Sequence, residues 1–203
     1  MLQINNVTKT FQNTRAVRDL SFDAGPGEIC GVLGPNGSGK TTTIRMILSI
    51  IAPDSGSILW NGLPVAYETL TNIGYLPEER GLYRKSKIGD VLSYFASLKR
   101  MSAAQARPAI GKWLERFGLK GMENRKIEEL SKGNQQKAQF IAAALHKPDL
   151  LILDEPFSGL DPINQIIFRD VAREIADEGA AIIFCTHQLE PAETFCDRFV
   201  ILN

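Results

Sequence analysis

One short stretch constrains this chain more than any other. Residues 34–41 read Gly-Pro-Asn-Gly-Ser-Gly-Lys-Thr and fit the pattern G-x-x-x-x-G-K-[ST]. Residues 29–33 before it form an apolar run that predicts a buried parallel strand, and residues 42–49 after it carry apolar side chains at helical spacing. The glycines let successive backbone N–H groups turn toward an anion, and the helix N-terminus adds its positive dipole end.

The stretch therefore predicts the phosphate-binding loop of a nucleoside triphosphate site. The residues expected to contact the nucleotide are Gly34, Pro35, Asn36, Gly37, Ser38, Gly39, Lys40, Thr41 and Thr42. Lys40 would reach the β- and γ-phosphates, and the Thr41 hydroxyl would bind Mg²⁺. The alternative, a glycine turn that only caps a helix, accounts less well for the strand before it and the helix after it.

The composition of the chain argues against other classes of protein. Across 203 residues, Lys plus Arg and Asp plus Glu both number 23, a balance that argues against a broad nucleic-acid-binding surface. Cys30, Cys185 and Cys196 form no C-x-x-C pair, so free thiols are expected in place of a metal site. No segment approaches ~18 uninterrupted apolar residues, and the first residues lack a basic region, which predicts a cytosolic chain that does not itself span a membrane.

Hydrophobic periodicity changes twice along the chain. Residues 1–60 alternate as strands do, and Asn61-Gly62 is a hairpin signal, so an antiparallel sheet is expected beside the parallel one. Residues 73–76 form a further short strand. Between about residues 87 and 146 the apolar spacing is helical, which predicts three helices.

The remaining residues return to alternating strands and helices. Buried strands are expected at residues 150–153 and 180–185, and a last strand at 199–202. The predicted fold class is α/β, a P-loop NTPase with a RecA-like parallel core, an N-terminal antiparallel β subdomain and a helical insertion. Residues 1–203 are expected to form a single domain, with residues 87–146 as its helical subdomain.

Two adjacent carboxylates end the apolar run at residues 150–153. Burying Asp154 and Glu155 side by side costs several kcal/mol without a counter-charge, and Mg²⁺ with its phosphates is the natural partner. Asp154 is expected to hold the metal through its water shell, as the Walker B acid does, and Glu155 to polarise the attacking water as general base. The alternative is an acid pair that caps a helix.

The segment Leu-Ser-Lys-Gly-Asn-Gln-Gln at residues 130–136 narrows the family. Alone it is an ordinary helix start with Ser131 as N-cap. Between a phosphate loop and an acidic strand end it resembles the signature motif of ABC ATPases, usually Leu-Ser-Gly-Gly-Gln, with Lys132 and Asn134 as departures. The resemblance implies that Ser131 and Gly133 form a second anion site, which closes on ATP held by another subunit.

Further motifs follow in the order of that family. Residues 158–161 resemble the D-loop at the subunit junction, and His187 matches the switch histidine that contacts the γ-phosphate. Phe11 lies where the family has an aromatic that stacks on adenine, and a core position is the alternative. The other histidine, His146, ends a helix and is expected to complement its dipole.

Residues 74–78 resemble the Q-loop, whose Gln usually reaches Mg²⁺ and the attacking water. This chain has Glu78 at that position, and a solvated loop acid is the alternative. Glu78 in this loop and Leu-Ser-Lys-Gly in the signature motif together resemble the export subfamily related to sodium and drug efflux ATPases. The catalytic residues implied by the resemblance are Lys40, Glu155 and His187, and the implied metal ligands are Thr41, Glu78 and Asp154.

The resemblance, which covers residues 11–187, implies a function and partners. The chain would be the Mg²⁺-dependent, ATP-binding and ATP-hydrolysing subunit of an ABC transporter, energising export or transport through a separate membrane subunit. Implied partners are a second ATPase subunit, identical or different, with ATP at the interface, and a transmembrane permease that docks about residues 79–99. The chain would then lie peripherally on the inner face of the cell membrane, with no nucleic acid as partner.

Two other classes are weighed against this interpretation. A soluble ABC ATPase of DNA repair or translation usually carries a long coiled coil, a second cassette or a basic tail, and none is visible. A module that senses ATP without turnover is disfavoured because Glu155 and His187 are both present. The transported substrate and the direction of transport stay open, because the membrane partner selects them. ABC ATPases normally continue beyond residues 199–202, so a compact variant and a truncated chain are both compatible with the sequence.

Overall fold

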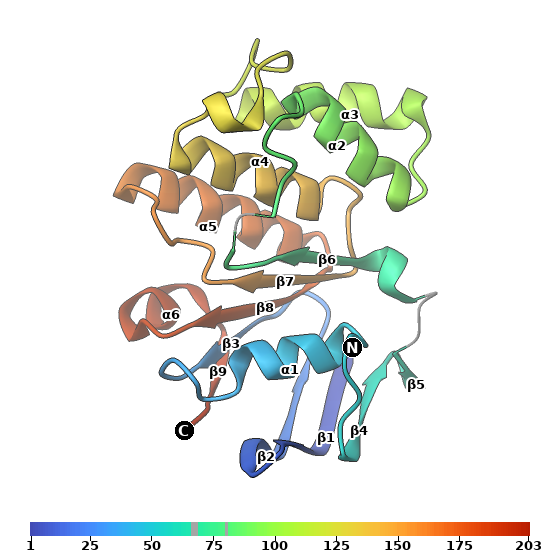
Figure 1. Cartoon of the computed structure of the whole chain (residues 1–203), viewed down its shortest axis with the longest axis vertical. Coiled ribbons are helices and arrows are strands. Elements are labelled where there is room, and N and C mark those ends of the chain that lie inside the picture. The colour runs from blue at the N-terminus through green and yellow to red at the C-terminus, as the bar shows by residue number, and fades with distance from the viewer. Residues whose placement is uncertain (66–68, 80) are drawn as a thin grey trace.

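Two β-sheets organise the computed structural model, which describes residues 1–65, 69–79 and 81–203 (Figure 1). The antiparallel sheet has the strand order β2-β1-β4-β5. Its strands are β1 Leu2–Phe11, β2 Thr14–Ala24, β4 Ser55–Trp60 and β5 Leu63–Pro64. The expected hairpin is confirmed, since Trp60 pairs with Leu63 across Asn61 and Gly62, which both have the positive φ that a tight hairpin turn requires.

The second sheet is parallel, with the strand order β6-β7-β8-β3-β9. Its strands are β3 Ile29–Leu33, β6 Ile73–Leu76, β7 Leu150–Asp154, β8 Ala181–Thr186 and β9 Arg198–Ile201. Every residue of β3, β7 and β8 is buried, as continuous apolar runs predict for strands covered on both faces. The α/β fold class is therefore confirmed.

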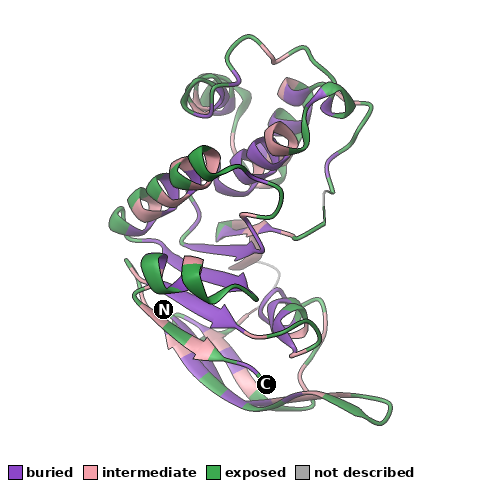
Figure 2. Cartoon of the chain, turned by 90° about the vertical axis from the view of Figure 1, so that its left-hand side faces the viewer, coloured by how far each residue is buried: buried purple, intermediate pink, exposed green. Residues whose placement is uncertain are grey.

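Alternate residues of the parallel sheet enter two different hydrophobic cores. In β7, Ile152 packs with α1 (Lys40–Ile47) and the antiparallel sheet, whereas Leu151 and Leu153 pack on the opposite side. That opposite side is covered by α4 (Lys132–Ala144), α5 (Pro162–Asp177) and α6 (Leu189–Phe195). Figure 2 shows the buried residues following the strands and the inner faces of these helices.

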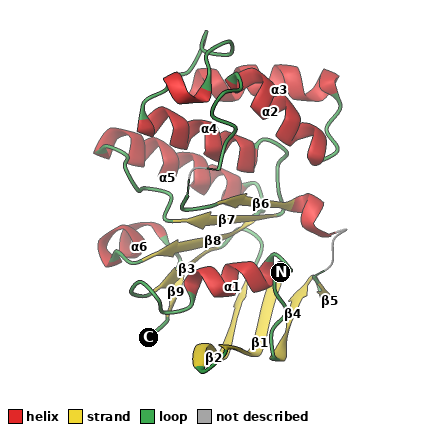
Figure 3. Ribbon diagram, in the orientation of Figure 1, coloured by secondary structure: helices red, strands yellow, loops and turns green. Residues whose placement is uncertain are grey.

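Three helices occupy the region where helical spacing was expected. They are α2 Ile88–Leu98, α3 Ala103–Arg116 and α4, with a short 3-10 turn at Ile127–Glu129 (η2) between α3 and α4 (Figure 3). A second 3-10 turn, Thr69–Asn72 (η1), lies outside this region, directly before β6. Phe117, the C-cap of α3, stacks on Trp113 and packs at a tilt against Phe140, and so joins α3 to α4. The predicted helices are confirmed, while the division into a domain and a subdomain stays a prediction.

Two further predictions concern the cysteines and His146. Cys30, Cys185 and Cys196 are free thiols, as expected. His146 follows α4, but burial and the nearby Lys99 ammonium lower its pKa to about 4, so it is neutral at neutral pH. The expectation that it complements the helix dipole as a cation is wrong. Among the described residues, none of the helices combines the length and apolarity needed to cross a bilayer.

Candidate functional site

The loop between β3 and α1 has a backbone shape that depends on glycine. Gly37 and Gly39 have φ values of 85° and 98°, in the left-handed region. A Cβ on Gly39 would lie 2.3 Å from the carbonyl oxygen of Ala16, and a Cβ on Gly34 would lie 2.4 Å from Ser38 Oγ. Glycine is therefore the residue that fits these positions, and the loop leaves an open cradle at the N-terminus of α1.

Lys40 is held over this cradle. Its side chain is buried, and Nζ donates hydrogen bonds to the carbonyl oxygens of Gly34 at 2.6 Å and Pro35 at 3.1 Å. An ammonium has three N–H donors, so one is left for an anion above the loop. The Ser38 hydroxyl is buried and has no hydrogen-bond partner among the described residues. Both groups fit a phosphate in the cradle.

The cradle opens into a cavity of about 300 Å³ at the carboxyl ends of β3 and β7. Its lining consists of Ala16, Asn36, Gly37, Gly39, Lys40, Thr41, Thr42, Glu78, Asp154 and Glu155. The structure thus brings together the phosphate loop, Glu78 and the adjacent pair Asp154 and Glu155, three parts of the chain that lie far apart in the sequence. Hydroxyl and carboxylate oxygens are the ligands that Mg²⁺ prefers, so Thr41, Glu78 and Asp154 fit the cation of a magnesium nucleotide.

Asp154 lies deepest among the three acids. Its side chain is 2% exposed, and burial raises its pKa to about 6, with further contributions from the charges of Glu78 and Glu155. The Lys40 ammonium opposes this rise but does not cancel it. The three carboxylates together therefore carry more negative charge than the Lys40 ammonium neutralises, and this excess favours binding of a cation.

Glu155 follows β7 and is oriented by the end of β8. Its Oε2 accepts a hydrogen bond from Thr186 Oγ1 at 3.0 Å, and its Oε1 accepts one from the backbone N–H of His187 at 2.8 Å. The backbone of Glu155 has a φ of 46°, a left-handed conformation that is unusual for a non-glycine residue. His187 therefore lies beside Glu155, while its predicted contact with the γ-phosphate stays a prediction. Thr186, which directly precedes His187, was not predicted as a site residue.

Phe11 and the predicted second anion site lie outside this cavity. Phe11 ends β1 and is 47% exposed, which excludes the alternative core position, while adenine stacking stays a prediction. Ser131 caps α4, and its Oγ accepts a hydrogen bond from the backbone N–H of Asn134 at 3.3 Å, as predicted for the N-cap. Figure 1 shows α4 and α1 on opposite sides of the parallel sheet. Ser131 and Gly133 are thus separated from the phosphate loop of the same chain.

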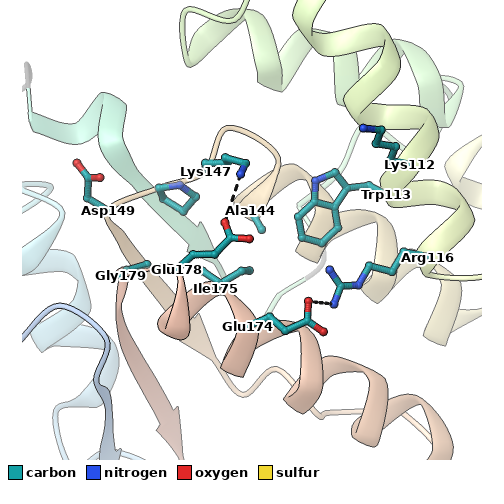
Figure 4. Close-up of a pocket in the computed structure, with 12 residues that line it drawn as sticks. Lys112, Trp113, Arg116, Ala144, Lys147, Asp149, Glu174, Ile175, Glu178 and Gly179 are labelled. Atoms are coloured by element: carbon teal, nitrogen blue, oxygen red, sulfur yellow. Dashed lines mark hydrogen bonds and ion pairs between the residues drawn. The ribbon is translucent and has the colours of Figure 1, made fainter.

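A larger cavity, of about 490 Å³, lies between α3 and α5 near the amino ends of β7 and β8 (Figure 4). Four of its charged side chains form two ion pairs. Arg116 forms an ion pair with Glu174, and Lys147 Nζ lies 3.3 Å from Glu178 Oε2. Although Lys112 also lines this cavity, the cavity's described lining residues include no phosphate-type glycine loop, so the smaller cavity with its cradle at the N-terminus of α1 is the candidate nucleotide site.

Comparisons with known proteins agree with this arrangement. Residues 17–158 match the family model described as ABC transporter. The ABC transporter ATP-binding protein YhaQ of Bacillus subtilis (strain 168) is 52% identical over 203 residues, which are 100% of this chain and 68% of YhaQ. The linearmycin resistance ATP-binding protein LnrL of the same strain is 34% identical over 206 residues, covering 100% of this chain and 66% of LnrL. A solved ATP-binding subunit of an ABC transporter superimposes with a TM-score of 0.92 and 32% identity, over 100% of this chain and 85% of that one.

Proposed function

This chain belongs to the ABC transporter family of ATP-binding proteins, and within that family we propose that it hydrolyses ATP to ADP and phosphate with Mg²⁺ in the cavity around Lys40. The observation that carries the proposal is the orientation of Glu155. Its carboxylate lines the phosphate cavity while Thr186 and His187 hold both of its oxygens. A carboxylate oriented beside a phosphate cradle can accept a proton from an attacking water, which is general-base catalysis.

The other residues of the cavity have distinct tasks. Lys40 and the loop N–H groups bind and orient the phosphates, and stabilise the charge that develops on them. Thr41, Glu78 and Asp154 would hold Mg²⁺, which when bound neutralises phosphate charge. His187 and Thr186 keep Glu155 in one orientation, so that less reorganisation is needed when the proton is transferred.

A second ATPase subunit is part of the proposal. Ser131 and Gly133 sit at the N-terminus of α4, where backbone N–H groups and the helix dipole favour an anion. Because the parallel sheet separates this helix end from the phosphate loop of the same chain, we propose that it contacts ATP bound to an identical or different partner subunit. Phe11, exposed at the end of β1, would stack on the adenine.

A transmembrane permease is the second proposed partner, with this chain on the inner face of the cell membrane. A cavity of about 390 Å³ next to β6 carries mainly apolar side chains, among them Leu70, Leu82 and Phe95. Beside it, Tyr83 and Tyr94 are exposed and pack edge to face, 5.7 Å between ring centroids. Apolar and aromatic groups of this kind suit a docked helix. The docking segment predicted at residues 79–99 includes both tyrosines, while its Arg80 lies outside the described residues.

Export is the direction of transport that we favour for the transporter of this chain. The relative LnrL is named for linearmycin resistance, and the Glu78 and Leu-Ser-Lys-Gly sequence features favour the same subfamily. We therefore propose that ATP hydrolysis drives export of a substrate chosen by the membrane subunit. The alternative, a soluble ATPase of DNA repair or translation, is not favoured by relatives named as transporter ATP-binding proteins.

Two experiments test the proposal. Purified chain is incubated with ATP and Mg²⁺, and released phosphate is measured for the native chain and for Glu155→Gln, which keeps the shape of the side chain. We expect Glu155→Gln to bind ATP while its turnover falls at least about 100-fold. Equal turnover would show that Glu155 is not the base. Affinity capture from the source cells should recover a membrane protein, and recovery of ribosomes or DNA would favour the alternative class.

A further inference from the structure

The helix α4 carries two buried glutamines whose amides reach the loops of the nucleotide cavity. Gln136 is 2% exposed, and its Nε2 donates a hydrogen bond to the carbonyl oxygen of Pro156 at 3.2 Å. Gln139 is 4% exposed, and its Nε2 donates to the carbonyl oxygens of Pro77 and Glu79, both at 3.0 Å. Since residues three apart lie on the same face of a helix, both amides point from α4 toward the cavity loops.

These carbonyls flank the carboxylates of the site. Pro156 directly follows Glu155, while Pro77 and Glu79 enclose Glu78 on either side. Carbonyl oxygens only accept hydrogen bonds, so the NH₂ group of Gln139 must face them, and its Oε1 faces away. Among the described residues this buried Oε1 has no hydrogen-bond partner. The two hydrogen bonds from Nε2 therefore fix the orientation of the Gln139 amide and hold the backbone on both sides of Glu78 to α4.

The backbone of α4 is also in close contact with the strand that leads into this loop. A Cβ on Gly74 of β6 would lie 2.2 Å from the carbonyl oxygen of Ala143 in α4. No side chain fits between the two segments, so β6 and α4 pack backbone to backbone. Gln139 lies one helical turn before Ala143, and its amide reaches the loop into which β6 continues, at Pro77 and Glu79. The helix thus holds both the strand and the loop that follows it.

We propose that Gln139 is a positioning residue, which fixes the loop around Glu78 to the helix that begins after Ser131. The proposal rests on the proposed function. One end of α4 carries the predicted contact with the partner's ATP, and its middle holds Glu78 beside the chain's own nucleotide cavity. Movement of α4 when two subunits close therefore moves Glu78 with it. Gln139 acts through Glu78 and does not itself touch the nucleotide.

Gln135 provides a matched control on the same helix. Its Nε2 donates to the carbonyl oxygens of Ile127 at 3.1 Å and Leu130 at 3.0 Å, and not to those of Pro77 and Glu79. The variants Gln139→Met and Gln135→Met each remove two amide hydrogen bonds and keep a side chain of similar length. In the nucleotide-free chain, we expect the amides of Glu78 and Glu79 to exchange hydrogen at least about 10-fold faster in Gln139→Met and less than about 3-fold faster in Gln135→Met.

A double-mutant cycle tests whether the effect passes through Glu78. ATP affinity is measured by calorimetry over a series of Mg²⁺ concentrations for the native chain, Gln139→Met, Glu78→Gln and the double variant. We expect Gln139→Met to raise the Mg²⁺ concentration for half-maximal affinity about 3- to 10-fold in the native background, and less than about 2-fold once Glu78 is replaced. Equal shifts in both backgrounds would overturn the proposal, as would equal exchange at Glu78 in the two methionine variants.

These measurements distinguish failure of the proposed function, failure of the role of Gln139 and failure of a variant to fold. If the native chain shows no Mg²⁺-dependent ATP binding, the proposed function fails first. If the native chain binds ATP and the two backgrounds respond alike, only the role of Gln139 fails. Should Gln139→Met not fold, Gln139→Asn takes its place, because its shorter amide cannot reach both carbonyls yet remains polar. The same exchange and affinity limits then apply to it.

Discussion

His187 Nδ1 lies 2.7 Å from Glu155 Oε1, the oxygen that also accepts the backbone N–H of His187 at 2.8 Å. The second oxygen of Glu155 is held by Thr186, so both oxygens have fixed partners. The His187 ring is 47% exposed at the side-chain level, whereas Glu155 is 9% exposed. The pair therefore joins a buried carboxylate to a ring at the surface, where a ligand or a second subunit can reach it.

The first prediction concerns this pair. His187→Ala should lower ATP turnover about 100-fold, because Glu155 loses its ring partner, while ATP affinity changes less than about 3-fold. The backbone N–H of residue 187 and Lys40 both remain, so binding is preserved. Phosphate release and calorimetry measure the two quantities. Unchanged turnover, or an equal loss in both, would contradict the assignment of His187 to the chemical step.

The second prediction concerns Lys40. Lys40→Ala should weaken ATP binding at least about 10-fold, because the cradle loses a charge-assisted donor whose other two N–H groups are already held by Gly34 and Pro35. Lys112→Ala, at an exposed position of α3 that lines the larger cavity, is the control and should leave the affinity unchanged. Calorimetric titration with ATP and Mg²⁺ gives both values. The same affinity for native chain and Lys40→Ala would rule out the cradle as the phosphate site.

The third prediction concerns Glu78, whose charge contributes to the raised pKa of Asp154. Glu78→Gln should keep Mg²⁺-dependent hydrolysis but raise the Mg²⁺ concentration needed for half-maximal rate about 3-fold or more, because one anionic oxygen is lost from the cation site. Turnover is measured against Mg²⁺ concentration. If Glu78→Ala leaves both the rate and the Mg²⁺ dependence as in the native chain, Glu78 is an ordinary loop acid.

The fourth prediction concerns pH and His146. Its folded pKa of about 4 lies below the ordinary value of 6.5, so only the unfolded chain takes up the proton between these values. The contribution of neutral His146 to the free energy of unfolding is fully present above pH ~6.5. It is lost as the pH falls toward ~4, by up to about 3 kcal/mol. His146→Leu should remove this contribution to the pH dependence of the free energy of unfolding. Urea unfolding of both chains between pH 4 and pH 7 measures it, and parallel curves would exclude a neutral buried His146.

How much the sequence predicts differs between local and long-range features. The phosphate loop and the N-cap Ser131 were predicted because a few neighbouring residues determine them. The neutral state of His146 was missed because burial depends on how α4 packs against β6. The hydrogen bonds of Gln139 to Pro77 and Glu79 join residues about 60 positions apart, and no local pattern contains such pairs.

The last prediction tests the site shared by two subunits. Each chain presents one phosphate loop, at Lys40, and one helix end, at Ser131, and the parallel sheet keeps them apart. Two chains placed head to tail would bury two ATP molecules, each between the loop of one chain and the helix end of the other. ATP would then favour the closed dimer and hydrolysis would release it, because the γ-phosphate contacts both subunits.

Glu155→Gln should trap this closed state, since it removes the base and keeps the shape of the site. We expect it to sediment as a dimer with ATP and Mg²⁺ and mostly as a monomer with ADP. Adding Ser131→Arg should abolish the dimer while ATP binding by the monomer stays within about 3-fold, because the larger side chain obstructs only the opposing site. Sedimentation of the four combinations of Ser131 variant and nucleotide decides between the models. A monomer under all four would leave ATP binding intact and refute the shared site, whereas a dimer that survives Ser131→Arg would place the interface elsewhere on the chain.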